Sequence, residues 1–217
     1  MKTLLFERKD GAFTFLDLLI VLVTVGLVAV LYLAWVSQAR ARPSRINCIS
    51  NLRQVGLGFR MWSNDHNDTF PWNVSTNDGG TKEYAGTTEV FRHFAIASNE
   101  FSSPRILACP VDQGRARATA FDASLNNGNV SYFVGLDSDE AKPASILSGD
   151  RTITTNGFLT AGFLTISTNS RVRWAKGLHT DVGNIAQGDG SAQQMSAVAL
   201  QTFTRTNAEP PLRLILP

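Results

Sequence analysis

Three side chains near the C-terminus are of the types that carry acid–base chemistry. His179 is followed by Asp181 and, ten residues after the histidine, by Asp189 with Gly190 beside it. A histidine held by a carboxylate can act as the general base of a hydrolase. Such an enzyme also needs a nucleophile and an oxyanion site, and no motif for either accompanies these residues. We therefore expect no enzyme and no catalytic residue. His179 is expected instead to hydrogen-bond across a sheet and fix a hairpin, and a membrane-anchored hydrolase is an alternative.

Two polar clusters have residue types that bind ions. Asp65, Asn67 and Asp68 carry the oxygen ligands that Ca²⁺ prefers, but neither the glycine nor the distal glutamate of an EF-hand loop follows them. Asx-turns that end a helix explain this run better. Arg115 and Arg117 resemble a weak phosphate site, and we expect both to be solvated. The sequence therefore predicts no metal ion and no cofactor.

The two cysteines, Cys48 and Cys109, show no metal-ligand spacing. Outside the cytosol they could form one disulfide, which would tie a helix to a downstream strand. A disulfide that closes a loop of this length contributes roughly 3–5 kcal/mol to stability. Inside the cytosol they would be two buried thiols, and the sequence leaves both states open.

The elements that position these residues begin with an apolar run over residues 13–36, FTFLDLLIVLVTVGLVAVLYLAWV. About two dozen helical residues span the roughly 30 Å hydrocarbon core of a bilayer. Asp17 lies inside the run, where a charge costs roughly 2.5–3.5 kcal/mol at mid-membrane and less near the helix end. Asp17 is therefore either a functional group with a charged partner or a carboxylate solvated at the membrane surface.

The 217 residues leave room for this helix and one further domain of roughly 150 residues. Residues 37–62 continue the helix in amphipathic form, and Pro43 predicts a kink or a local break near Arg42. The expected apolar stripe consists of Ile49, Leu52, Val55, Phe59 and Trp62.

Residues 63–217 alternate polar loops with short strand-like runs. The expected elements are a short helix over residues 89–97, strands over 105–110, 131–136, 145–150 and 171–174, and a hairpin over 184–195. In that hairpin Asp189-Gly190 favours a tight turn with both residues at positive φ. The pattern predicts an α+β fold in which a small antiparallel sheet packs against the amphipathic part of the helix.

The segment from residue 11 to residue 20, GAFTFLDLLI, resembles the cleavage and methylation motif of type IV pilins and type II secretion pseudopilins. In that family a small residue precedes the cut, Phe follows it, and an acidic residue is fifth after it. The resemblance implies a leader over residues 1–12 and a cut between Ala12 and Phe13. A cut after Gly11 would make Asp17 the sixth residue instead.

The resemblance also implies a role for Asp17 in assembly. Cleavage creates an amino group on Phe13 in apolar surroundings, and Asp17 of a neighbouring subunit would neutralise it. Two buried charges that are each costly alone become tolerable as a pair. The family usually has Glu at this position, so the shorter Asp is a departure.

Downstream segments are similar to a pseudopilin-like group abundant in planctomycete and verrucomicrobial bacteria. They are residues 48–57 (CISNLRQVGL), Cys109-Pro110, residues 149–151 (GDR), and the spacing from His179 to Asp189-Gly190. The His-x9-Asp-Gly spacing is a structural marker of that group with no assigned chemistry.

This resemblance implies a pilin-like fold and a structural subunit of a type II secretion pseudopilus or a type IV pilus-like filament. Its partners would be copies of itself, other pseudopilins, the prepilin peptidase and the inner-membrane assembly platform. The chain would cross the bacterial inner membrane once, with residues 63–217 in the periplasm or in an extracellular filament.

The alternative class is a binding module, either a membrane-tethered domain or a minor-pilin adhesin that recognises glycan, DNA or protein. Arg171, Arg173, Trp174 and Lys176 would form its basic and aromatic contact surface. A net charge of +2 is too small to indicate a nucleic-acid partner by itself.

Overall fold

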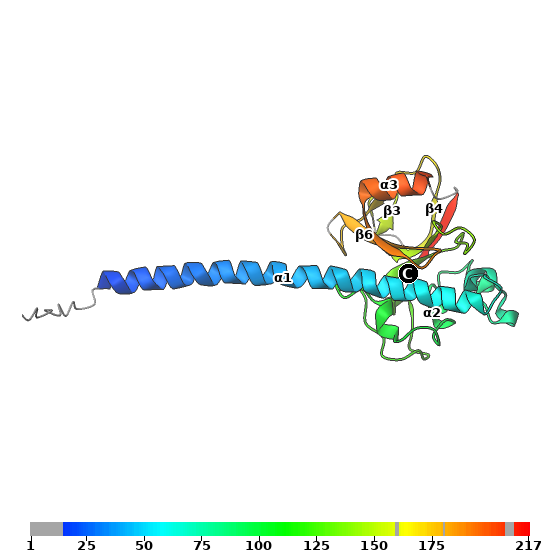
Figure 1. The fold of residues 1–217 in the computed structure, drawn as a ribbon, viewed down its shortest axis with the longest axis horizontal. Helices are drawn as coiled ribbons and strands as arrows, with labels where there is room; N and C mark the ends of the chain where they lie inside the picture. Colours follow the sequence, from blue (N-terminus) through cyan, green and yellow to red (C-terminus); the bar gives the residue numbers. More distant parts are fainter. Residues whose placement is uncertain (1–14, 159–160, 180, 207–210) are drawn as a thin grey trace, which may run out of the picture. The chain divides into compact units, whose positions relative to one another are not determined.

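The structure is a computed structural model of the chain, and it describes residues 15–158, 161–179, 181–206 and 211–217. The chain divides into two compact units, of which the second runs from Ser44 to Pro217. The helix α1 (Phe15–Asn64) contributes residues to both units (Figure 1). The expected processing residues Gly11, Ala12 and Phe13 lie outside the described residues.

The first unit contains the apolar part of α1. The window from Phe15 to Leu33 has a mean hydropathy of 2.7, and none of it is buried. Its 19 residues measure about 28 Å along a helix, close to the hydrocarbon thickness of a bilayer. Asp17 lies in the first turn. The helix is therefore long and apolar enough to cross a membrane.

The chain stays helical through Pro43, so the local break expected near Arg42 is not found in this described stretch. A proline inside a helix removes one backbone hydrogen bond, while the bonds of the neighbouring turns remain.

In the second unit, one face of α1 enters the core. The stripe expected from the sequence is confirmed, because Leu52, Val55, Phe59 and Trp62 are buried and Ile49 is partly buried. Gly56 permits a close approach to a later hairpin, since a Cβ at this position would lie 3.3 Å from the carbonyl oxygen of Gly190.

Short helices and turns connect α1 to the sheet. They are η1 (Pro71–Asn73), η2 (Thr76–Asp78), η3 (Lys82–Tyr84), α2 (Phe91–Ala95), η4 (Pro104–Leu107) and η5 (Asn127–Asn129). The helix expected over residues 89–97 is confirmed by α2. The strand expected over residues 105–110 was wrong, because these residues begin within η4. Ser103 caps that turn by accepting from the backbone N of Arg105, and Pro104 follows as its first residue.

Six strands of the described part form an antiparallel sheet in the order β4-β8-β1-β2-β6-β7. They are β1 (Tyr132–Gly135), β2 (Ile146–Asp150), β4 (Gly162–Ile166), β6 (Val182–Gln187), β7 (Ala192–Ser196) and β8 (Leu212–Leu216). A two-stranded sheet pairs β3 (Ile153–Thr154) with β5 (Arg173–Trp174), and α3 (Ala197–Thr206) precedes β8. The strands expected over residues 131–136, 145–150 and 171–174 are confirmed, and the fold is α+β.

The sheet carries a hydrophobic core on each face. Successive residues of a strand point to opposite faces, and in β1 Tyr132 and Val134 join the core beneath α1 while Phe133 joins the other core. Within the second unit, α3 covers the face opposite the C-terminal part of α1 (Figure 1). This second core includes Trp174 and Leu200.

The β6–β7 hairpin is confirmed, but its turn differs from the one expected. The backbone N of Gly190 donates to the carbonyl of Gln187 at 2.9 Å, and the N of Gln187 donates to the carbonyl of Ser191 at 2.9 Å. Only Gly190 has a positive φ, of 79°, whereas Asp189 does not. The connection is therefore a three-residue loop that ends in a left-handed glycine, rather than a two-residue turn.

Candidate functional site

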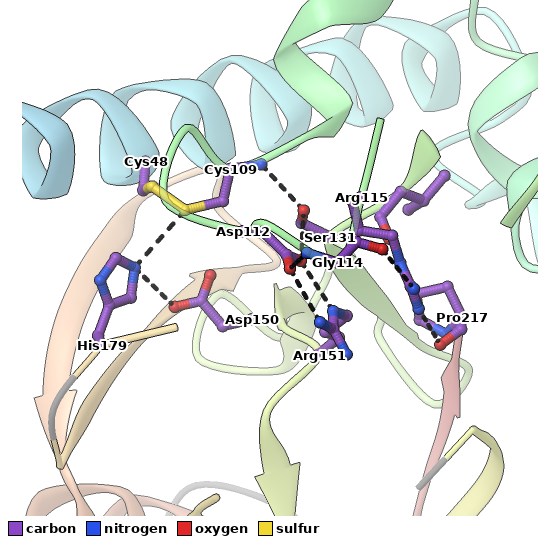
Figure 2. A network of polar contacts seen from close by, with 11 residues as sticks. Cys48, Cys109, Asp112, Gly114, Arg115, Ser131, Asp150, Arg151, His179 and Pro217 are labelled. Atoms are coloured by element: carbon purple, nitrogen blue, oxygen red, sulfur yellow. Dashed lines mark hydrogen bonds and ion pairs between the residues drawn. A yellow bond between two sulfur atoms is a disulfide. The ribbon is translucent and has the colours of Figure 1, made fainter. Parts of the chain in front are cut away.

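A disulfide joins Cys48 of α1 to Cys109 in the loop after η4, across a sequence separation of 61 (Figure 2). Both cysteines are buried. In the chain-entropy model a loop of this length contributes about 4 kcal/mol to stability. The disulfide therefore ties the helix to a loop that borders the sheet, not to the strand expected there.

His179 is buried beside this disulfide (Figure 2). Its Nε2 atom lies 3.7 Å from Cys109 Sγ, 3.6 Å from Asp150 Oδ2 and 3.3 Å from Asn184 Nδ2. The structure thus brings His179 to the end of β2 and to β6, which are neighbouring strands of the sheet.

The two aspartates considered as partners of His179 lie elsewhere. Asp181 is exposed and adopts a positive φ of 55°. Asp189 is in the hairpin turn, where Oδ1 accepts from the backbone N of Ser191 at 2.8 Å and the carbonyl oxygen accepts from Arg60 Nη1 at 2.9 Å. The His-x9-Asp-Gly residues therefore act at two separate places: His179 at the disulfide, and Asp189 with Gly190 at the turn beneath α1.

Asp150 is fully buried and is held by Asn184. Its Oδ2 accepts from the backbone N of Asn184 at 2.8 Å and from Nδ2 at 3.0 Å, whereas Oδ1 has no hydrogen-bond partner among the described residues. Burial raises the pKa of Asp150 to about 7, although the bonds from Asn184 oppose the rise. Burial lowers the pKa of His179. The 3.6 Å contact at neutral pH therefore joins a neutral imidazole to a partly protonated carboxyl.

A second carboxylate, Asp112, forms an ion pair that borders this cluster (Figure 2). Arg151 donates Nε to Oδ2 and Nη2 to Oδ1, both at 2.8 Å, and Ser131 Oγ donates to Oδ2 at 2.8 Å. Burial alone would raise the pKa of Asp112, but the hydrogen bonds from Arg151 and Ser131 outweigh it and lower the pKa. Ser131 Oγ also accepts from the backbone N of Cys109 at 3.0 Å, so the ion pair is linked to the disulfide loop.

Arg115 was expected to be solvated, and that expectation was wrong. Its Nε donates to the carbonyl of Val130 at 2.8 Å and its Nη2 donates to the carbonyl of Pro217 at 2.8 Å. With Nη1 donating to the carbonyl of Gly114 at 3.1 Å, the planar guanidinium bonds to three backbone oxygens. Arg117 is exposed, as expected.

Trp174 is not part of the basic and aromatic contact surface expected from the sequence. Trp174 is buried, and its Nε1 donates to the carbonyl of Met195 at 2.9 Å. Arg171, Arg173 and Lys176 are exposed. The tryptophan is a core residue because β5 alternates an exposed arginine with an inward side chain.

A pocket of about 750 Å³ lies where the turn after α1 meets the β1–β2 connection and the start of β8. One wall carries Asp137, whose Oδ1 accepts from Arg213 Nε at 2.9 Å. The charges of Asp137 and Arg213, which both line the pocket, therefore compensate each other.

The roles of Asp150, Asn184 and Asp112 are not predicted by the sequence. Asp150 ends a strand expected from the sequence and belongs with Arg151 to a segment that carries the resemblance, but no local signal pairs either residue with Asn184 or Asp112.

Comparison with known proteins gives no match to this chain among family models, curated proteins or solved structures. The chain is an α+β protein with one N-terminal helix that is apolar enough to cross a membrane.

Proposed function

We propose that this chain is a pilin-like structural subunit, which is processed near residue 12 and assembles through its N-terminal helix into a type II secretion pseudopilus or a type IV pilus-like filament. The observation that carries the proposal is the division of α1. Its residues from Phe15 to Leu33 are apolar and exposed, while its residues after Ser44 form part of a folded core. One helix thus offers an apolar assembly surface and is built into a globular domain.

The processing motif supports this function. Cleavage between Ala12 and Phe13 would leave a new amino group close to the start of α1, and Asp17 lies in the first turn of that helix. A carboxylate at a helix N-terminus is favoured by the helix dipole. In an apolar filament core, the Asp17 carboxylate of one subunit would compensate the Phe13 amino group of the next. The prepilin peptidase and the inner-membrane assembly platform are the implied partners.

The globular domain supports a structural role as well. Its sheet is filled on both faces by hydrophobic cores, and the disulfide fixes α1 to the domain. We place this domain in the periplasm or in an extracellular filament, where a disulfide persists.

Mass spectrometry of the mature protein purified from its host tests the proposal. We expect a chain that begins at N-methylated Phe13. A chain that begins at Ala12 would move the cut to Gly11 and make Asp17 the sixth residue. A mature chain that still carries Met1 would contradict processing and, with it, filament assembly.

A further inference from the structure

The cluster around the disulfide contains the ligand types that zinc uses. The Sγ atoms of Cys48 and Cys109 and the Nε2 atom of His179 all lie within 4.8 Å of one another, and the three residues are buried. The Oδ2 atom of Asp150 lies 3.6 Å from His179 Nε2. Two thiolates, an imidazole and a carboxylate are all established Zn²⁺ ligands. While the disulfide is intact, its sulfurs are not available as thiolates.

Two of the observed distances are close to edges of a tetrahedral zinc site. With a Zn–S bond of about 2.3 Å and Zn–N and Zn–O bonds of about 2.1 Å, neighbouring sulfur and nitrogen ligands lie about 3.6 Å apart. Nitrogen and oxygen ligands lie about 3.4 Å apart by the same geometry. His179 Nε2 is 3.7 Å from Cys109 Sγ and 3.6 Å from Asp150 Oδ2. His179 Nε2 therefore lies at ligand spacing from one sulfur and from one carboxylate oxygen, whereas the two sulfurs are bonded to each other and must separate to bind a metal.

The tautomer of His179 also suits a metal. Asn184 Nδ2 donates to Asp150 Oδ2 at 3.0 Å, which fixes the orientation of the amide, and it lies 3.3 Å from His179 Nε2. An amide NH₂ group only donates, so the ring nitrogen that faces it presents a lone pair. A neutral imidazole with a free lone pair is the form that binds a metal.

A buried oxygen supplies an independent sign of a ligand position. Asp150 is fully buried and its Oδ1 has no hydrogen-bond partner among the described residues. Buried carboxylate oxygens without a partner are rare, and a bound metal is one group that would satisfy such an oxygen. Asn184 holds Oδ2, the oxygen that lies 3.6 Å from His179 Nε2, so Oδ1 is the oxygen that a metal would take.

We propose that Cys48, Cys109 and His179 form a Zn²⁺ site when the disulfide is reduced, and that the neighbouring Asp150 carboxylate moves to supply the fourth ligand. A dithiol passes two electrons and two protons to the sulfur pair and becomes a disulfide itself. Zn²⁺ then displaces the two thiol protons, which go to solvent, and the metal does not change its oxidation state. The cluster thereby holds α1 against the sheet in both redox states, through a covalent bond when oxidised and through the metal when reduced.

Cobalt uptake by the full chain in detergent micelles tests this proposal. The chain is reduced with dithiothreitol, freed of reductant under anaerobic conditions and titrated with Co²⁺. We expect one Co²⁺ per chain, with the visible bands of tetrahedral cobalt and a sulfur-to-cobalt charge-transfer band, and displacement by Zn²⁺. The oxidised chain is expected to take up none. A reduced chain that binds no cobalt, or binds it without the charge-transfer band, would overturn the proposal.

Ligand variants identify the residues. We expect Cys48→Ser and Cys109→Ser to remove the charge-transfer band or to halve it. We expect His179→Ala and Asp150→Ala to weaken Zn²⁺ binding at least tenfold. His179→Cys restores a ligand and is expected to retain binding. His93→Ala is the matched control, because His93 is also buried but bonds to Thr81 instead. Equal affinities of the His93 and His179 variants would contradict the assignment, and the wild-type cobalt spectrum decides the question if a ligand variant fails to fold.

Discussion

Asp150 and Asn184 are joined by two hydrogen bonds across neighbouring strands: Oδ2 of the aspartate accepts from the backbone N of Asn184 at 2.8 Å and from its Nδ2 at 3.0 Å. Both residues are fully buried. The pair holds a carboxyl group at the end of β2, directly beside the histidine that borders the disulfide. Asp150 therefore connects the amide of Asn184 to the imidazole of His179 in the interior of this domain.

The first prediction concerns the amide of Asn184. Asn184→Ala removes one donor from a fully buried carboxyl and leaves a cavity, so the free energy of unfolding should fall by about 2–4 kcal/mol. Urea denaturation followed by circular dichroism measures the change. Gln193→Ala, at an exposed position of β7, is the control and should alter stability by less than about 0.5 kcal/mol. An Asn184 variant as stable as this control would show that the pair contributes nothing.

The second prediction concerns the pH dependence that Asp150 confers. Its pKa is about 7 in the folded chain, against about 3.9 for an unfolded aspartate. The folded state thus binds the proton more tightly, and the contribution of Asp150 to stability is greatest below pH 4. That contribution falls as the pH rises towards 7, by up to about 4 kcal/mol.

Comparison of the wild-type chain with Asp150→Asn isolates this contribution, because His179 and other groups titrate in both proteins. We expect the stability of the wild type relative to the variant to decline between pH 4 and pH 7 and to level off above pH 7. Parallel pH profiles of the two proteins would contradict a raised pKa at Asp150.

The third prediction concerns the ion pair between Arg151 and Asp112. Arg151→Ala leaves the Asp112 carboxylate almost fully buried without its bidentate partner, and we expect a loss of about 3–5 kcal/mol at pH 7. Because the pKa of Asp112 is lowered in the folded chain, this loss should disappear as the pH falls through that pKa.

A double-mutant cycle with Asp112→Asn measures the pairwise term by urea denaturation. The effect of Arg151→Ala should be much smaller when residue 112 is already neutral. An equal effect in both backgrounds would mean that Arg151 stabilises the fold through packing alone.

The fourth prediction concerns the contact between Gly183 and the ring of Trp174. A Cβ at residue 183 would lie 2.5 Å from ring atoms of Trp174, which is held in place by its hydrogen bond to Met195. Gly183→Ala should therefore destabilise the domain by about 1–3 kcal/mol in thermal unfolding. At Gly86 a Cβ would meet nothing within 4 Å, so Gly86→Ala should leave the melting temperature nearly unchanged.

The fifth prediction concerns assembly and rests on the proposed function. Asp17→Ala should leave membrane insertion intact, because it removes a charge from an apolar helix. It should reduce the yield of filaments in the host at least tenfold, and Asp17→Glu should restore most of the yield. Immunoblots of sheared filaments and of the membrane fraction separate the two effects. Unchanged filament yield in the Asp17→Ala strain would argue against charge compensation by this residue.

The sequence by itself determined the elements whose signals are local. These elements are the apolar run of α1, the stripe from Ile49 to Trp62 and the β6–β7 hairpin. Each follows from hydrophobic periodicity or turn residues within a segment of at most about two dozen residues. The same local signals located most strands of the sheet. They wrongly predicted a strand over residues 105–110. This apolar run is typical of a strand, but it begins within the short helix η4, which starts with the Ser103 cap and Pro104.

The tertiary structure alone decided which polar groups meet. His179 approaches Cys109 across 70 positions of the chain, Asp150 meets Asn184 across 34, and Arg115 reaches Pro217 across 102. No local pattern carries such information, because a buried charge or imidazole is placed by strand pairing and by the need to satisfy its hydrogen bonds. For the same reason Trp174, which resembles a surface contact in the sequence, is a core residue in the fold.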